Sequence, residues 1–205
     1  MYDAAMEPNK NATDTTRQKL LQAAFTEIYR KGFQAASLTQ ILAETSLTKG
    51  ALYHYFPDKK TLGLAVVEEM VRPYMASMSQ PLAETPQPLA TMQLLLAAKA
   101  AENEPQIVAL GCPLNNLMQE MSPIDETFRL HLNAIFQDWV AVLRDALTRG
   151  IKSGEVRRDV DASETAFFIV SALEGCVGMS KNTQSIKIFR GCLTQLGRFL
   201  DTLKR

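Results

Sequence analysis

The sequence predicts an all-α protein with a small N-terminal three-helix domain and a larger C-terminal helical domain. Apolar residues recur at steps of three and four through most of the chain, which is the period of amphipathic helices. Seven of the nine prolines lie between Pro73 and Pro123. Short helices are therefore expected in the middle of the chain, and long ones after Pro123.

Composition limits the classes of protein to consider. The chain has 205 residues, 46% of them hydrophobic, which is enough to bury a core. It has no uninterrupted run of about 18 apolar residues, and its N-terminus lacks the apolar segment of a secretory signal. The three widely spaced cysteines fit reduced thiols better than disulfides or a zinc site. We expect a cytoplasmic protein without a membrane span, metal or cofactor.

Charge does not by itself predict a nucleic-acid partner. The chain has 22 basic and 22 acidic residues, and residues 1–60 hold eight basic and six acidic ones. A protein that reads a DNA groove needs only a few well-placed cations. The prediction of DNA binding must therefore rest on a motif.

Residues 37–55 have the pattern of two short helices joined by a tight turn. Ser37 is a suitable N-cap, and Gln40 three residues later is expected to complete a capping box. The first helix should end at about Thr45-Ser46, and Thr48 should cap the second, which cannot extend through Pro57. This arrangement is the helix-turn-helix unit, whose second helix enters the major groove of DNA.

The second helix carries side chains suited to DNA. Lys49 is followed by the small Gly50 and Ala51, so nothing bulky keeps the backbone from base edges. Tyr53, His54 and Tyr55 then supply hydroxyl and imidazole groups for phosphate oxygens or bases. The alternative is that Tyr53 or Tyr55 only packs against the core of the small domain.

These residues resemble the DNA-binding domain of the TetR family of bacterial transcriptional repressors. The resemblance rests on Gly32-Phe33 and residues 37–42, 47–56 and 58–62. It implies a homodimer whose N-terminal domains bind a double-stranded DNA operator and whose C-terminal domains hold a small-molecule inducer. The residues expected to contact DNA are Ser37, Thr39, Thr48, Lys49, Gly50, Ala51, Tyr53, His54, Tyr55 and Lys59.

The expected domain limits follow from the motif. Residues 1–13 are polar and aperiodic and are interpreted as a flexible arm, residues 14–60 as the DNA-binding domain, and residues 61–205 as the ligand-binding and dimerisation domain. A helix that begins at Asp58 should link the two. Lys59, at its start, matches the lysine of the family that holds a phosphate.

The segment 111–120 is the most unusual part of the C-terminal half. It resembles the Gly-Cys-x-x-x-Asn-Leu stretch of some TetR-like regulators and places polar groups beside apolar ones, as a ligand site requires. Asn115 and Asn116 could instead cap and cross-link helix ends, and Phe136 and Trp139 could be core residues. The candidate ligand-binding residues are Cys112, Asn116, Met118, Glu120, Phe136 and Trp139.

Two further readings concern Cys112. At a helix N-terminus a cysteine can have a lowered pKa and react with oxidants or electrophiles, but no Lys, Arg or His stands beside it, which favours burial. An enzyme with Cys112 as nucleophile is weakly supported, because His54 and His131 are the only histidines and His54 belongs to the other domain.

The last two helices are expected to form the dimer. Residues 186–203 carry apolar side chains at steps of three and four, which is a bundle seam, and two glycines in this helix suggest close approach of another backbone. The expected interface residues are Ala172, Gly175, Met179, Phe189, Gly191, Leu196 and Gly197. The sequence thus predicts a ligand-responsive repressor that binds a palindromic operator, with an activator or a non-DNA helical adaptor as alternatives.

Overall fold

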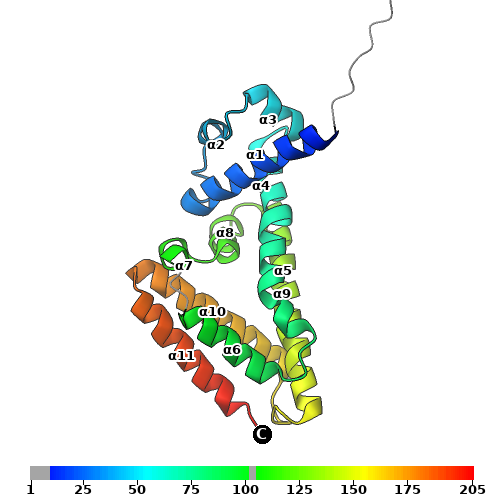
Figure 1. The fold of residues 1–205 in the computed structure, drawn as a ribbon, viewed down its shortest axis with the longest axis vertical. Helices are drawn as coiled ribbons and strands as arrows, with labels where there is room; N and C mark the ends of the chain where they lie inside the picture. Colours follow the sequence, from blue (N-terminus) through cyan, green and yellow to red (C-terminus); the bar gives the residue numbers. More distant parts are fainter. Residues whose placement is uncertain (1–9, 102–104) are drawn as a thin grey trace, which may run out of the picture. The chain divides into compact units, whose positions relative to one another are not determined.

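The computed structural model describes residues 10–101 and 105–205 and divides the chain into two compact units, one up to Val71 and one from Arg72 onward. Helices account for nearly all of the described residues (Figure 1). The sole extended pairing among them is an isolated bridge between Val156 and Lys204. The all-α prediction is therefore confirmed.

Unit 1 contains α1 (Lys10–Lys31), α2 (Leu38–Thr45), α3 (Lys49–Tyr55), α4 (Lys59–Val66) and a π-helix, η1 (Val67–Val71). α1 packs against both α2 and α4. Its apolar stripe and residues of the shorter helices form one buried core, made of Leu20, Leu21, Ala24, Ile28, Ile41, Leu42, Leu52, Phe56, Leu62 and Val66. The core fixes α2 and α3 in the helix-turn-helix arrangement.

Local signals set the ends of these helices. Gly32 has a φ of 81° and ends α1, and Ser46 ends α2 with a φ of 57°, so both take the left-handed conformation of a helix C-terminus. Ser37, Thr48 and Asp58 cap α2, α3 and α4 with side-chain oxygens that accept backbone N–H bonds. The caps at Ser37 and Thr48, the end of α2 near Ser46 and the helix start at Asp58 were expected from the sequence.

Two details of unit 1 differ from expectation. α1 begins at Lys10 rather than near Asp14, so part of the expected arm is helical; residues 1–9 of that arm lie outside the described residues. Gln40 does not complete a capping box, because the backbone N–H of Ser37 that its side chain would accept donates to Oε1 of Glu27 instead, at 3.3 Å. The side-chain amide of Gln40 donates to Oε1 of Glu44. Only the Ser37 half of the box forms.

The residues that connect the units are helical on both sides of the boundary. η1 follows α4 directly, and α5 (Arg72–Ala83) follows η1. The backbone N–H of Val67, the first residue of the π-helix η1, donates to the carbonyls of both Gly63 and Leu64. The first compact unit therefore ends at Val71, beyond the limit at residue 60 that the motif suggested.

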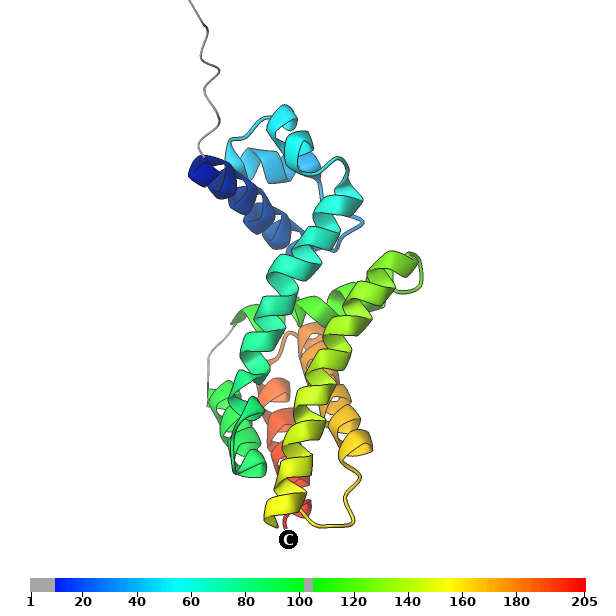
Figure 2. The same cartoon turned by 90° about the vertical axis from the view of Figure 1, so that its right-hand side faces the viewer.

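Unit 2 contains α5, α6 (Pro88–Ala101), α7 (Pro105–Leu110), α8 (Pro113–Met121), α9 (Glu126–Ser153), α10 (Ala162–Thr183) and α11 (Ile186–Thr202) (Figure 2). α9 packs against α5, α8 and α10, while α11 packs against α10 and α6. Pro88, Pro105 and Pro113 are the first residues of α6, α7 and α8, a position that suits proline because no backbone N–H is needed there. Pro81 lies inside α5, which ends two residues later.

The turn after α9 is bonded to the start of α6. The carboxylate of Glu155 accepts from the N–H groups of Leu89 and Ala90 at 3.2 and 3.0 Å and so caps α6. Gly150 permits this turn, since a Cβ there would lie 2.6 Å from Cγ2 of Val156. α10 is long and apolar enough to cross a membrane by length and composition, a test that bundle helices also pass, and here it packs between α9 and α11.

Candidate nucleic-acid interface and ligand cavities

α3 presents its polar side chains to solvent and its one large apolar side chain to the core. Leu52 is 1% exposed, whereas its neighbour Tyr53 is 51% exposed. The other exposed positions of the helix-turn-helix that were predicted to contact DNA are Thr39, Thr48, Lys49, Gly50 and His54, while Ser37, Ala51, Tyr55 and Lys59 are partly exposed. The exposed residues of α3 therefore form one polar face on an anchored helix.

The caps hold the two helices of the motif at their N-termini. Oγ1 of Thr48 accepts from the N–H of Ala51 at 3.2 Å, and Oγ of Ser37 accepts from the N–H of Gln40 at 3.4 Å. A hydroxyl that accepts in this way keeps its own hydrogen for donation. Ser37 and Thr48 are thus structural caps whose hydroxyl groups can still donate outward.

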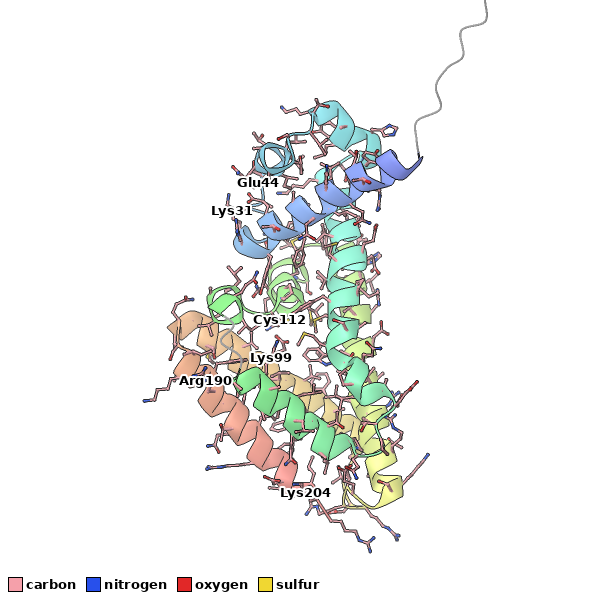
Figure 3. All side chains as sticks on the ribbon, in the orientation of Figure 1. Lys31, Glu44, Lys99, Cys112, Arg190 and Lys204 are labelled. Carbon is pink, nitrogen blue, oxygen red and sulfur yellow. The ribbon has the colours of Figure 1, made fainter. Side chains whose placement is uncertain are left out.

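Glu27 is a buried support of the motif that sequence reasoning missed. Its side chain is 6% exposed; Oε1 accepts from the backbone N–H of Ser37 at 3.3 Å and pairs with Nζ of Lys31 at 3.0 Å (Lys31 is labelled in Figure 3). The bond joins the end of α1 to the start of α2. The available signal was a glutamate within the apolar stripe of α1, four residues before a lysine.

Lys59 lies closer to its own chain than the resemblance implied. Its Nζ donates to the carbonyl of Gln34 at 2.9 Å and lies 5.0 Å from the ring centroid of Phe33. It therefore braces the loop between α1 and α2. Asp58 beside it caps α4 through the N–H of Thr61 at 2.6 Å, and this bond lowers the pKa of the Asp58 carboxyl.

Arg17 braces the other end of α3. Its guanidinium makes two bonds of 2.5 Å to the carboxylate of Glu69 in η1 and lies 5.3 Å from the ring centroid of Phe56, which ends α3. The bonds from Arg17 lower the pKa of Glu69. A bidentate pair with a stacked guanidinium has a defined geometry, so it orients the helix ends that it joins.

Unit 2 encloses an apolar cavity of about 300 Å³ among α5, α6, α9, α10 and α11. Two charged side chains, Lys99 and Glu174, are among the residues that line it. The remaining wall is largely Met, Leu, Ile and Val, and it includes Cys112 and Trp139. This combination of an apolar wall and a few polar groups is typical of small-molecule sites.

A second hollow, of about 500 Å³, is lined by residues of α8, α9 and α10. Met118, Phe136 and Trp139 line it together with residues of α10 that include Glu174 and Gly175. Trp139 and Glu174 thus contribute to both cavities. The two side chains form a shared wall between them.

The candidate ligand residues divide between these cavities and the packing of helix ends. Cys112 and Trp139 line the first, and Met118, Phe136 and Trp139 line the second. Asn116 and Glu120 line neither. Nδ2 of Asn116 donates to the carbonyl of Leu110 at 2.7 Å, and its Oδ1 accepts from Lys181 at 3.1 Å, so Asn116 cross-links helix ends.

Glu174 is a polar residue of the cavities that sequence reasoning did not identify. Cys112 and Asn115 line the cavities together with Glu174, and its Oε2 is buried without a hydrogen-bond partner. Burial raises the pKa of Glu174 to about 7 from an ordinary value of 4.5, and the two neighbouring side chains partly oppose that rise. On the sequence it is one acid in an apolar helical stretch, and nothing local marks it.

The environment of Cys112 opposes a reactive thiolate. The residue is 7% exposed at the start of α8 (Figure 3) and makes no side-chain capping bond there. Burial, and then the charge of Glu174, raise the pKa of the thiol well above its usual range. The hypothesis of an oxidant or electrophile sensor at Cys112 therefore loses its physical basis. Sequence spacing also hid that Cys176 on α10 and Cys192 on α11 lie close enough to interact, which adds to burial in raising the pKa of Cys176.

The expected interface residues fall into two groups. Phe189 and Leu196 are 2% and 4% exposed in the core of the subunit, so the structure contradicts their assignment to a surface between subunits. Their places in the bundle seam explain this, since the seam faces α6 and α10. The remaining five, Ala172, Gly175, Met179, Gly191 and Gly197, are exposed or partly exposed.

Comparison with known proteins identifies the same two regions. Residues 20–66 match the model described as bacterial regulatory proteins of the tetR family, and residues 89–196 match that of the tetracyclin repressor-like C-terminal domain. The chain is 29% identical over 174 residues to an uncharacterised HTH-type transcriptional regulator of Lactococcus lactis, covering 84% of this chain and 87% of that one. It is 26% identical to the HTH-type transcriptional repressor DhaR of Mycobacterium sp. strain GP1, covering 81% and 82%.

Solved structures share the fold across both units. The regulatory protein TetR from Rhodobacter sphaeroides has a TM-score of 0.79 at 25% identity, covering 89% of this chain and 97% of that one. A TetR transcriptional regulator from Chloroflexus aurantiacus has a TM-score of 0.84 at 23% identity, covering 95% and 98%. With a helix-turn-helix in unit 1 and the matching helical domain in unit 2, the chain belongs to the TetR family of DNA-binding transcriptional regulators.

Proposed function

We propose that the protein is a ligand-responsive repressor that binds a palindromic operator as a homodimer in the cytoplasm and is released by a small-molecule inducer. The exposed polar face of α3 is the observation that carries this proposal. Lys49, Gly50, Tyr53 and His54 are all exposed there, while Leu52 anchors the helix from beneath. A helix that is rigidly held and polar on its outer face is suited to the major groove.

The residues of this face have different proposed roles. Thr39, Lys49 and His54 are placed nearer the bases, and Tyr53 contacts phosphate. Gly50 has no side chain to hold the backbone away from the groove, and a Cβ there would meet only Oγ1 of Thr48, at 3.8 Å, within the unit. Lys59 is proposed to reach phosphate only as a secondary role, since its Nζ already holds the carbonyl of Gln34.

Dimerisation is proposed to use the outer faces of α10 and α11. Four of the nine large hydrophobic residues that are exposed among the described positions lie on these two helices, namely Phe167, Phe168, Met179 and Ile188. A Cβ at Gly175, Gly191 or Gly197 would meet nothing within 4 Å in the subunit. A four-helix bundle with a second copy would cover this surface and set two recognition helices about 34–36 Å apart.

Induction is proposed to begin in the cavities of unit 2. A ligand there would stabilise the conformations of α5 and α10 that it fits best, and α5 continues through η1 into α4 of the DNA-binding unit. The effect on operator affinity then equals the difference in ligand affinity between the two conformations of the dimer.

Selection of duplex DNA from a random pool tests the proposal. The wild type is expected to enrich a palindrome, and the double variant Lys49→Ala, Tyr53→Ala to bind it at least about 100-fold more weakly, because groove and phosphate contacts are both lost. Lys152→Ala removes an exposed cation from unit 2 and serves as the control. Wild-type affinity should fall steeply with salt through counterion release.

The same preparation tests the oligomeric state. Light scattering should give a dimer for the wild type and a monomer for Met179→Glu, since a charge would be buried in the bundle. Failure to enrich any sequence at low salt without ligand would contradict the DNA-binding proposal. A folded wild-type monomer would contradict the palindrome.

A further inference from the structure

The free oxygen of Glu174 is the least explained polar atom of unit 2. Oε2 is buried and has no hydrogen-bond partner, although it lies in the wall shared by two cavities. Among the described residues, one other buried side-chain atom lacks a hydrogen-bond partner. It is Nε of Arg149, a residue that lines neither cavity. An unsatisfied carboxyl oxygen is costly in an apolar site unless a ligand completes it.

The neighbours of Glu174 define what that ligand group must be. Cys112 lines the first cavity and Asn115 the second, each together with Glu174. Both side chains act on the carboxyl group in the direction that lowers its pKa, which is the effect of a donor on a carboxylate. A carboxyl group surrounded by donors is arranged as an anion that accepts hydrogen bonds. The remaining oxygen therefore calls for another donor.

Positive charge for this anion is scarce within the cavities. The titratable and charged residues that line them besides Glu174 are Tyr74 on α5, Lys99 on α6 and Cys112 on α8. α9 and α11 contribute apolar lining residues, namely Phe136, Trp139, Leu143, Phe189, Leu196 and Leu200. The free oxygen Oε2 of Glu174 receives no hydrogen bond from Lys99 or from any other cation of the described residues. On the same helix as Glu174, Lys181 is bonded to Asn116. This oxygen is therefore open to a cation that a ligand supplies.

We propose that the cavity of about 300 Å³ selects small apolar ligands that carry a protonated amine, and that the free carboxylate oxygen of Glu174 binds this amine. The inference rests on the proposed function, because it names the chemical class of the inducer. The apolar wall accounts for the hydrocarbon part of the ligand, and the volume is at the lower end for small-molecule sites. Charge-assisted bonds in such surroundings are short and strong.

The proposed amine site predicts how ligand affinity depends on pH. Glu174 is partly protonated near its pKa of about 7, so an incoming ammonium group displaces the carboxyl proton. Affinity for an amine should then rise with pH through this range, as long as the amine itself stays protonated. A ligand that offers a neutral acceptor would bind the protonated carboxyl group, and its affinity would fall as pH rises.

Octylamine and 1-octanol are suitable probes, because they share one hydrocarbon chain and differ in the polar group. Quenching of Trp139, the only tryptophan and a residue of both cavity walls, reports binding to the full-length protein. At about pH 8 the amine is expected to bind at least roughly tenfold more tightly than the alcohol. Its affinity should drop several-fold at about pH 6, below the Glu174 pKa of about 7.

Glu174→Gln should bind both probes equally and without this pH dependence, since it keeps the shape of the side chain and removes its charge. Glu164→Gln changes an exposed acid on the same helix and should behave as wild type. Equal binding of the two probes to wild type, amine affinity that falls with pH, or no binding of either probe would each overturn the inference. Operator binding measured on the same samples keeps the two proposals apart, because its loss would count against the repressor and not against the amine site.

Discussion

α3 and α10 use polar side chains in opposite ways. On α3 the polar residues stand on the outer face, and the helix is held by one buried leucine, a threonine cap and neighbours on α1. On α10 the decisive polar residue, Glu174, points inward and depends on Cys112 and Asn115 from α8. The first surface is complete within one short stretch of chain, whereas the second exists only once several helices have packed.

This difference determines whether a substitution at each site changes binding alone or binding together with stability. An exposed face tolerates substitution of its contact residues without loss of the fold, because those side chains carry little of the packing. A buried polar group couples ligand recognition to stability, because the same desolvation acts in both. Substitutions in the two helices should therefore separate binding from stability in unit 1 and join them in unit 2.

The largest expected effect comes from the buried and exposed neighbours on α3. Leu52→Ala should destabilise unit 1 by about 2–5 kcal/mol, because it removes a fully buried side chain and leaves a cavity. Tyr53→Ala should change stability by no more than about 0.5 kcal/mol while weakening DNA binding. Denaturant titration followed by circular dichroism measures both. Equal destabilisation by the two variants would show that α3 has no separate outer face.

The next effect concerns the pH dependence of unit 2. The unfolded chain loses the Glu174 proton near its ordinary pKa of 4.5, but the folded chain keeps it to about 7. Folded protein thus binds more protons between these values, so stability falls as pH rises through that window. Glu174→Gln removes the free-energy cost of ionising this carboxyl group in the folded protein. It should stabilise the protein by on the order of 2 kcal/mol at pH 8 and by almost nothing at pH 4.

Thermal unfolding of wild type and Glu174→Gln across that pH range makes the measurement. Glu164→Gln is again the control, since that acid is exposed. A Glu174→Gln variant that is less stable than wild type at pH 8 would show that the carboxylate is satisfied in the folded protein.

A smaller effect is expected from the caps of the helix-turn-helix. Ser37→Ala and Thr48→Ala each remove the acceptor for a backbone N–H and should each cost about 1 kcal/mol. Substitution to Gly should cost only a few tenths of that loss, because water can then reach the helix end. Amide hydrogen exchange of residues 38–41 and 49–52 would locate the change, and exchange that is unaltered there would rule out the capping role.

The smallest effect is expected at Cys112. Because its thiol is buried and its pKa is raised, a thiol-specific reagent should modify the partly exposed Cys192 well before Cys112. Peptide mapping after brief alkylation of native protein shows the order. Cys112→Ser should leave any response to electrophiles unchanged. Modification of Cys112 ahead of Cys192 would restore the sensor hypothesis.

Much of the N-terminal unit follows from the sequence alone. The caps at Ser37, Thr48 and Asp58, the left-handed Gly32 and the exposed residues of α3 are set by interactions within a few residues, so a short stretch of sequence contains them. The bundle seam of α11 also follows from helical periodicity, but the assignment of Phe189 and Leu196 to the dimer interface was wrong, because both are buried within the subunit.

Other features required the tertiary structure. Lys59 was expected to bind phosphate, but packing brings its Nζ to the carbonyl of Gln34. Glu27 accepts from the backbone N–H of Ser37. Glu174, which nothing marks on the sequence of α10, lines the cavities together with Cys112 and Asn115. Each of these depends on contacts between residues far apart in the chain, and desolvation depends on everything that surrounds a group. Local sequence therefore determined the helices and the outer face of α3, while packing decided which polar groups are buried and what chemistry the cavities present.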